Sequence, residues 1–202
     1  MFFSKKLVID QPAKNTPVAD VPFLAVDFET TGTDPRRDHI VSMGWIPLQG
    51  SEIHLGGAGY HVIKGAAVGE SALIHGLTDT DVASGVSLEE GLDELLAALD
   101  GRILLAHFAG LELGFLRKAV DEVHNKKLQL RAVDTFALER RHMERMGTYP
   151  RGEDLRLQRV CERYGLPKHG AHNAAGDALA CAELFLAQQT RTKARTLADL
   201  LT

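Results

Sequence analysis

Two acidic residues interrupt an apolar stretch near the start of the chain. Residues 23–32 read FLAVDFETTG, and Asp27 and Glu29 stand in a run that otherwise has the composition of a buried strand. Side chains two residues apart on a strand point to the same face, so the two carboxylates lie together at its C-terminal end. Burying unpaired carboxylates costs several kcal/mol. A positive group must therefore lie between them, either Arg or Lys or a metal ion.

Length and composition favour one compact domain. The chain has 202 residues, of which 45% are hydrophobic, enough for one core. Because Pro12 and Pro17 lie among Lys, Asn and Asp, we expect a loosely structured N-terminal arm at residues 1–21, ahead of a domain at residues 22–202. Cys161 and Cys181 are outside any CxxC pattern, which indicates buried free thiols in a reducing cytoplasm, with a disulfide as the alternative.

Charge and hydropathy limit the classes of partner. The net charge of −4 is not a basic signature for nucleic acid, although acids at a metal site can mask local basic patches. No apolar run approaches the ~20 residues that span a bilayer. The first residues also lack a signal segment. We therefore expect a cytoplasmic protein without membrane partners.

Hydrophobic periodicity predicts an α/β fold with a mixed, five-stranded sheet flanked by helices. Three strands without an intervening helix imply an antiparallel meander, which βα units then extend. The expected strands are 23–29, 39–48, 52–63, 102–106 and 128–133. The expected helices are 88–100, 111–123, 134–145, 154–164 and 173–190.

Three groups of polar residues follow strands or open helices of this scheme. Asp27 and Glu29 end the first strand, His107 and Glu112 follow the strand 102–106, and the segment 172–177 (HNAAGD) opens the last helix. Ligands bind beyond the carboxyl ends of such strands. Clustered carboxylate oxygens suit Mg²⁺ or Mn²⁺ rather than zinc, and a histidine beside the metal can take a proton from water. The pattern favours metal-dependent phosphoryl transfer to water.

Three segments in this order resemble a known family. FLAVDFETTGTDPRRDHIVSMGWI (23–46), LLAHFAGLELGFL (104–116) and HNAAGDALACAELF (172–185) are similar to the three motifs of the DnaQ-like, DEDDh-type 3′→5′ exonucleases. IHGLTD (74–79) and VDTFAL (133–138) also resemble that family. Its members include the proofreading ε subunit of bacterial DNA polymerase III and ribonuclease T.

The resemblance implies an RNase H-like fold and a set of roles. Asp27, Glu29 and Asp177 would hold two divalent cations, Mg²⁺ or Mn²⁺, with Asp27 bridging both. His172 would be the general base for the attacking water. Residues expected near the terminal nucleotide are Thr30, Thr31, Gly32, His75 and Leu77, with Leu77 as an apolar wedge against the last base. Lys168, four residues before His172, is a candidate phosphate contact.

The second motif departs from the family pattern. Family members end it as HNAxFD, whereas this chain reads His107-Phe108-Ala109-Gly110-Leu111-Glu112. Glu112 keeps the charge of the usual Asp but is one methylene longer, so it either reaches the metal or crowds it. An error of about an ångström can cost ~100-fold in rate. We include Glu112 among the predicted catalytic and metal-binding residues.

Simpler roles also exist for several of these residues. Asp177 can complement the helix dipole, Asp134 is predicted to cap the helix that follows it rather than bind metal, and His107 is predicted to be structural. The sequence favours a 3′→5′ exonuclease that releases nucleoside 5′-monophosphates from single-stranded ends. DNA is the favoured substrate, and a replication or polymerase complex is a candidate partner. The alternatives are an RNA-trimming enzyme of the ribonuclease T type and a weakly active nucleic-acid-binding module.

Overall fold

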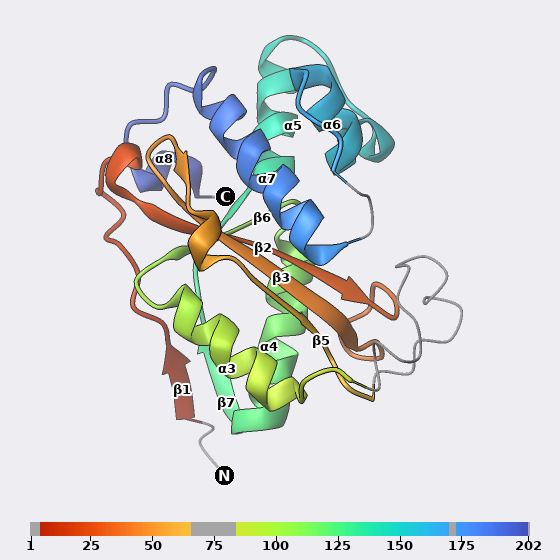
Figure 1. Ribbon diagram of the computed structural model, residues 1–202. Coiled ribbons are helices and arrows are strands. Elements are labelled where there is room, and N and C mark those ends of the chain that lie inside the picture. Colours follow the sequence, from red (N-terminus) through yellow and green to blue (C-terminus); the bar gives the residue numbers. More distant parts are fainter. Residues whose placement is uncertain (1–4, 66–83, 170–172, 202) are drawn as a thin grey trace.

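A mixed β-sheet with helices on both faces forms the centre of the molecule (Figure 1). The computed structural model describes residues 5–65, 84–169 and 173–201. Strand β2 (Pro22–Thr30) pairs antiparallel with β3 (Ile40–Gln49) and parallel with β6 (Ile103–Ala106). Strand β8 (Ala132–Asp134) continues the sheet in parallel beyond β6. The predicted mixed sheet flanked by helices is confirmed.

The expected strand at 52–63 is two strands separated by a short 3-10 helix. Strand β4 (Glu52–Ile53) pairs with the end of β3, and β5 (Gly59–Val62) pairs with its first half. The helix η2 (Leu55–Gly57) lies between them. Its two glycines have low strand propensity, which explains the break. Six strands thus occupy the five predicted positions in this sheet.

The expected strand at 128–133 is also divided. Strand β7 (Lys126–Gln129) leaves the main sheet and pairs in parallel with β1 (Lys5–Val8), whereas β8 joins β6. At the break, the Gln11 side chain forms two hydrogen bonds with the backbone of Arg131. Its Oε1 accepts from the Arg131 N–H at 2.8 Å, and its Nε2 donates to the Arg131 carbonyl at 3.0 Å. Because these groups are bonded to a side chain, the strand ladder stops there.

The prediction of a loosely structured arm is wrong for residues 5–21. Besides β1, this segment contains the 3-10 helix η1 (Val18–Asp20), and Val21 is fully buried. The carbonyl of Thr16 accepts from the N–H of Leu197 at 2.9 Å, and Gln11 also donates to the carbonyl of Arg102 at 3.1 Å. The prolines indicated an irregular backbone, but long-range hydrogen bonds hold it in place. The division into an arm and a domain at residue 22 stays a prediction.

Alternating side chains of β2 face two separate cores. Leu24, Val26 and Phe28 pack with helices α3 (Leu88–Leu99) and α4 (Gly110–His124). Phe23 packs on the other face, against Phe185 of α7 (Ala174–Gln189), with ring centroids 4.7 Å apart. Asp27 and Glu29 share the parity of Phe23, so they face α7, which crosses that side of the sheet in Figure 1.

The remaining helices surround α7. Helices α5 (Thr135–Arg145) and α6 (Leu157–Tyr164) pack against it, and the short α8 (Leu197–Leu200) adds Leu197 and Leu200 to the same core. The predicted start of α6 at residue 154 is wrong, because the 3-10 helix η4 (Gly152–Leu155) precedes it.

Cys161 and Cys181 are buried free thiols, as predicted. None of the helices in the described ranges has the length and apolar character to cross a membrane.

Candidate active site

Three carboxylates meet where β2 approaches the start of α7. One carboxylate oxygen each from Asp27, Glu29 and Asp177 lies within 4.8 Å of the others. Asp177 is in the first turn of α7, which begins after the N-cap Asn173. Asn173 Oδ1 accepts from the N–H of Gly176 at 3.1 Å. The cap sets the helix start and thereby places Asp177 above the strand.

Gly44 allows this close approach and was missed in the sequence. It lies directly opposite Asp27 in the β2–β3 ladder. A Cβ atom on Gly44 would fall 2.4 Å from the carbonyl carbon of Ala174 in the first turn of α7. The helix therefore rests on the bare backbone of β3. The available signal was a glycine inside an otherwise apolar strand, which often marks a close backbone approach.

Glu112 lies beside this cluster with an unused oxygen. Its side chain is 2% exposed, and its Oε2 has no hydrogen-bond partner within the described residues. It belongs to the first turn of α4, and its charge raises the pKa of Asp27. Burial raises the pKa of Glu112 itself to about 8. A buried oxygen without a partner is rare, and a cation would satisfy it.

The electrostatics of the cluster call for a positive ion. The pKa of Asp27 lies well above its ordinary value because of burial first, and then because of the charges of Glu112, Asp177 and Glu29. Like charges at this spacing cannot all ionise without compensation. The donor set consists of hard carboxylate oxygens, which fit divalent cations such as Mg²⁺ and Mn²⁺.

His107 and Asp134 have the structural roles expected of them. His107 Nδ1 is 2.8 Å from Thr135 Oγ1, and Nε2 is 2.7 Å from the carbonyl oxygen of Leu155. Burial lowers the pKa of His107, and both ring nitrogens are occupied. Asp134 caps α5 by accepting from the N–H of Phe136 at 2.9 Å. Neither residue belongs to the group of three carboxylates.

Phe108 presents an exposed ring just beyond the end of β6. It directly follows His107 beyond the end of β6, and 54% of its surface is exposed. Its φ of 74° is unusual for a bulky residue. The Asp134 carboxylate holds this conformation by accepting from the Phe108 N–H at 2.9 Å. The ring meets Phe136 edge-on, with centroids 5.3 Å apart.

The loop after β2 is folded around Asp38. Thr30 Oγ1 donates to the carbonyl of Gly32 at 2.7 Å, and Thr31 Oγ1 donates to Asp38 Oδ1 at 3.4 Å. Thr31 Oγ1 also accepts from the N–H of His39 at 3.0 Å. A Cβ atom on Gly32 would lie 2.5 Å from Asp38 Oδ2. These bonds order the loop that was predicted to meet the terminal nucleotide.

Two cavities border Asp177. One, of about 330 Å³, also contacts Asp27 and two cationic residues, Arg156 and Arg159. The other, of about 250 Å³, includes Lys168. The Nζ atom of Lys168 lies 2.7 Å from Glu162 Oε1, so this predicted phosphate contact is already in an ion pair. The predicted residues His75, Leu77 and His172 lie outside the described residues.

Comparisons with known proteins identify the family of the chain. The exonuclease family model RNase_T matches residues 24–185. A PolC-type DNA polymerase III of Thermotoga maritima is 31% identical over 182 residues, covering 89% of this chain and 13% of that protein. The DNA polymerase III subunit epsilon of Treponema pallidum is 27% identical over 165 residues, covering 82% of this chain and 75% of that protein.

The structure also resembles a solved exonuclease structure. E. coli exonuclease I in complex with a 5cy-dT13 oligonucleotide superimposes with a TM-score of 0.70 at 17% identity, covering 89% of this chain and 42% of that one. This likeness confirms the predicted RNase H-like fold. The chain spans only 13% and 12% of the two PolC-type relatives. By the match over residues 24–185, the chain belongs to the exonuclease family.

Proposed function

We propose that this protein is a metal-dependent 3′→5′ exonuclease acting on single-stranded DNA ends and releasing nucleoside 5′-monophosphates. The observation that carries the proposal is the group of three carboxylates from β2 and α7, within 4.8 Å of one another, in a chain of the exonuclease family. The buried Oε2 of Glu112, which has no hydrogen-bond partner in the described part of the chain, supports it.

The residues divide the work between metal binding and proton transfer. Asp27, Glu29, Asp177 and Glu112 would hold two divalent cations, Mg²⁺ or Mn²⁺. Bound there, the cations would polarise the scissile phosphate and lower the pKa of the attacking water. His172 would accept the proton of that water as general base. Asp27 is on the same face of β2 as Phe23, so its side chain faces α7. This arrangement orients the carboxylate before substrate binds.

The surroundings of the carboxylates suit one unstacked nucleotide. Arg156 and Arg159 line the same cavity as Asp27 and would contact phosphates of the strand. Thr30, Thr31 and Gly32 would face the terminal sugar, with His75 and Leu77 near the base. Lys168 would join them only after leaving Glu162. A site of this size favours a single strand, because a paired end must fray before its last nucleotide enters.

DNA is the proposed substrate, with an RNA end as the alternative. The support comes from the relatives, which are described as DNA polymerase III proteins, and from the exonuclease I complex with an oligo-dT strand. The same relatives support a polymerase complex as a partner and a cytoplasmic location. Rates on matched DNA and RNA strands decide the substrate, because only RNA presents a 2′-OH for recognition.

Digestion of a 5′-labelled single strand tests the proposal. The wild-type protein with Mn²⁺ should produce a ladder that shortens from the 3′ end, and EDTA should stop it. Asp27→Ala should be inactive, whereas the matched variant Asp20→Ala, in the surface helix η1, should keep full activity. Strand binding without any ladder would instead establish a nucleic-acid-binding module.

A further inference from the structure

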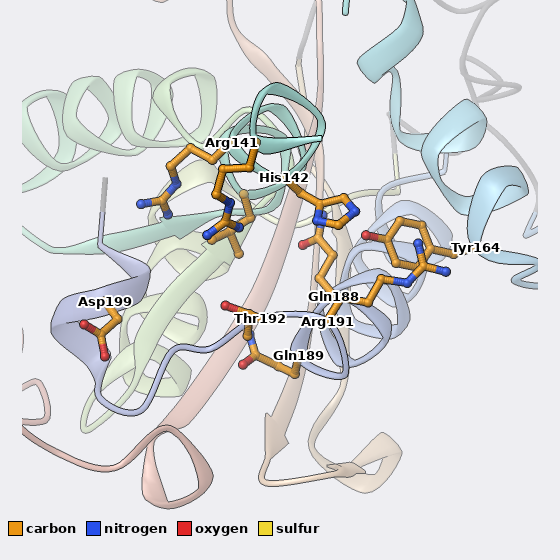
Figure 2. Close-up of a pocket in the computed structure, with 10 residues that line it drawn as sticks. Arg141, His142, Tyr164, Gln188, Gln189, Arg191, Thr192 and Asp199 are labelled. Atoms are coloured by element: carbon orange, nitrogen blue, oxygen red, sulfur yellow. The ribbon is translucent and has the colours of Figure 1, made fainter. Parts of the chain in front are cut away.

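A second polar pocket lies at the far end of α7 from the carboxylates. Figure 2 shows Gln188, at the end of that helix, beside His142, with Arg141 on one side and Arg191 next to Tyr164 on the other. Gln188 follows Asp177 by eleven helical residues, about 16 Å along the axis. The pocket therefore shares a helix with the proposed active site but none of its lining residues.

The pocket carries uncompensated positive charge. Arg141, Arg145 and Arg191 line it, and within residues 5–65, 84–169 and 173–201 none of the three forms an ion pair. Arg191 lies over the Tyr164 ring, 4.4 Å from its centroid. This contact leaves its charge unbalanced.

One acid borders the pocket but is already engaged. Asp199 Oδ2 accepts from the N–H groups of Arg195 and Thr196, at 2.9 and 3.0 Å. These bonds begin the short helix α8 and lower the pKa of Asp199. This single carboxylate faces three arginines, so the lining of the pocket keeps a net positive charge that favours an anion.

Two buried amide atoms in the pocket also lack partners. The Gln188 side chain is only 5% exposed, and its Nε2 donates to the carbonyl of Thr135 at 3.0 Å. Its Oε1 has no partner among the described residues, and neither does the buried Nε2 of the adjacent Gln189. Buried polar atoms are nearly always satisfied. Both residues line the pocket, so a rotation of each side-chain amide would present one unused acceptor and one unused donor to a ligand beside the arginines.

Size and hydrogen bonding narrow the ligand. The cavity measures about 70 Å³, room for about two waters and far below the ≈ 300 Å³ at which pockets for drug-sized molecules begin. A small oxyanion fits, and a nucleobase does not. Because Gln188 Oε1 accepts only, that anion must also carry a donor. Hydrogen phosphate keeps an O–H at neutral pH, whereas sulfate has none.

We propose that this pocket binds a protonated phosphate group, either free inorganic phosphate or the 5′-phosphate of a mononucleotide. The arginines neutralise its charge, Gln189 Nε2 donates to one oxygen, and Gln188 Oε1 accepts from its O–H. Arginine suits such planar, multiple contacts to phosphate. The site lies outside the proposed exonuclease centre, so its occupancy does not depend on that function.

Calorimetric titration of the full chain in EDTA tests the site. Inorganic phosphate should bind about tenfold more tightly than sulfate, the difference that one charge-assisted hydrogen bond makes. Arg145→Gln and Arg191→Gln should each weaken phosphate binding by about tenfold. Lys193→Gln is the matched control, because Lys193 is in the same tail but does not line the pocket, and it should change nothing.

Gln188→Met tests the hydrogen-bond argument. Methionine keeps the length of the side chain, and the variant should bind phosphate and sulfate equally. Its circular dichroism and melting temperature show whether it still folds, and the two arginine variants decide the site if it does not.

Titrating a nucleoside 5′-monophosphate at mildly acidic pH separates the two sources of the phosphate. Binding of inorganic phosphate alone assigns the site to the free ion, and binding of both assigns it to phosphate monoesters as well. The proposal is overturned if phosphate does not bind, if sulfate binds equally well to the wild type, or if Lys193→Gln weakens binding as much as Arg145→Gln does.

Discussion

The two ends of helix α7 carry side chains of opposite charge. At its start Asp177 joins Asp27 and Glu29, and at its end Arg191 lies with Arg141 and Arg145. The dipole of any helix favours acids at its first turn and cations at its last turn. The sign of the charged side chains at each end of α7 therefore does not by itself indicate a binding site. The ends resemble sites because each also has a buried polar atom that has no partner within residues 5–65, 84–169 and 173–201, namely Oε2 of Glu112 and Oε1 of Gln188.

This comparison teaches that the two ends require opposite ligands. The acidic end is completed by cations and the basic end by an anion, and each should bind without the other. A substitution at one end of α7 should therefore leave ligand binding at the other end unchanged.

The largest effect should come from removing one carboxylate. Asp177→Asn keeps the size of the side chain but removes a charge from the metal site, and activity should fall by well over the 10- to 100-fold that is typical of residues supporting a metal ligand. Initial rates on a labelled strand measure the loss. Phosphate binding at the far end should be unchanged. A variant that retains a tenth of its activity would contradict the role of Asp177.

The next effect should come from a methyl group at Gly44. The new Cβ would fall 2.4 Å from backbone atoms of α7, so the helix must move away from β2 and carry Asp177 with it. A shift of about 1 Å should cost ~100-fold in rate. Gly56→Ala is the matched control, since its Cβ meets nothing within 4 Å. Equal rates for the two variants would show that the contact does not position the site.

In the absence of metal, the stability of the folded protein should depend on pH, with a smaller effect than the two substitutions above. Burial raises the pKa of Glu112 from 4.5 to about 8, so between these values the folded protein holds a proton that the unfolded chain has released. Stability in EDTA should therefore fall as the pH rises through this range. The melting temperature should drop by about 2–4 °C for each kcal/mol lost.

Two comparisons check the cause of that drop. Glu112→Gln should make the pH dependence shallower, leaving only the part due to Asp27, whose pKa is also raised. Added Mn²⁺ should restore stability most strongly at the higher pH, because the carboxylates must lose their protons to bind it. A melting temperature that is independent of pH in EDTA would argue against the buried acids.

Glu112→Asp distinguishes the two interpretations of the longer side chain. If Glu112 crowds the metal, shortening it to the residue usual in the family should raise the rate. If it reaches the metal directly, the same change should weaken Mn²⁺ binding, and Glu112→Ala should weaken it further. Unchanged rate and metal affinity in both variants would remove Glu112 from the site.

The smallest effect should come from Arg145→Gln at the other end. Because sites without shared partners act independently, the exonuclease rate on a short strand should stay within about twofold of wild type. The same assay used for Asp177→Asn measures it. A large loss would show that the strand itself reaches the basic end, and the two ends would then form one binding surface.

The acidic end was largely predictable from sequence, since its residues fall in short motifs. The alternation along 23–29 placed Asp27 and Glu29 on one face, and the spacing in 172–177 placed Asp177 at a helix start. Gly44 was not found, because its role depends on α7 approaching a strand 130 residues earlier in the chain. The buried position of Glu112 also could not be predicted, because it depends on the packing of α4.

The basic end had no such pattern. Arg141 and Arg145 are on α5, Gln188 ends α7, and Arg191 follows it. Only the packing of α5 on α7 brings these residues together. A glutamine in an alanine-rich helix does not by itself indicate a binding site. The N-terminal segment was mispredicted for a related reason. Its order depends on Gln11, whose partners Arg102 and Arg131 are distant in sequence.

Anomalous diffraction from crystals soaked in Mn²⁺ tests whether the carboxylate end of α7 binds cations while its arginine end excludes them. The account predicts Mn²⁺ peaks bounded by the carboxylates of Asp27, Glu29 and Asp177, with Glu112 turned toward them, and none between Arg141 and Arg191. Absence of a peak at the three carboxylates, in crystals soaked at a Mn²⁺ concentration that supports digestion in solution, would contradict it.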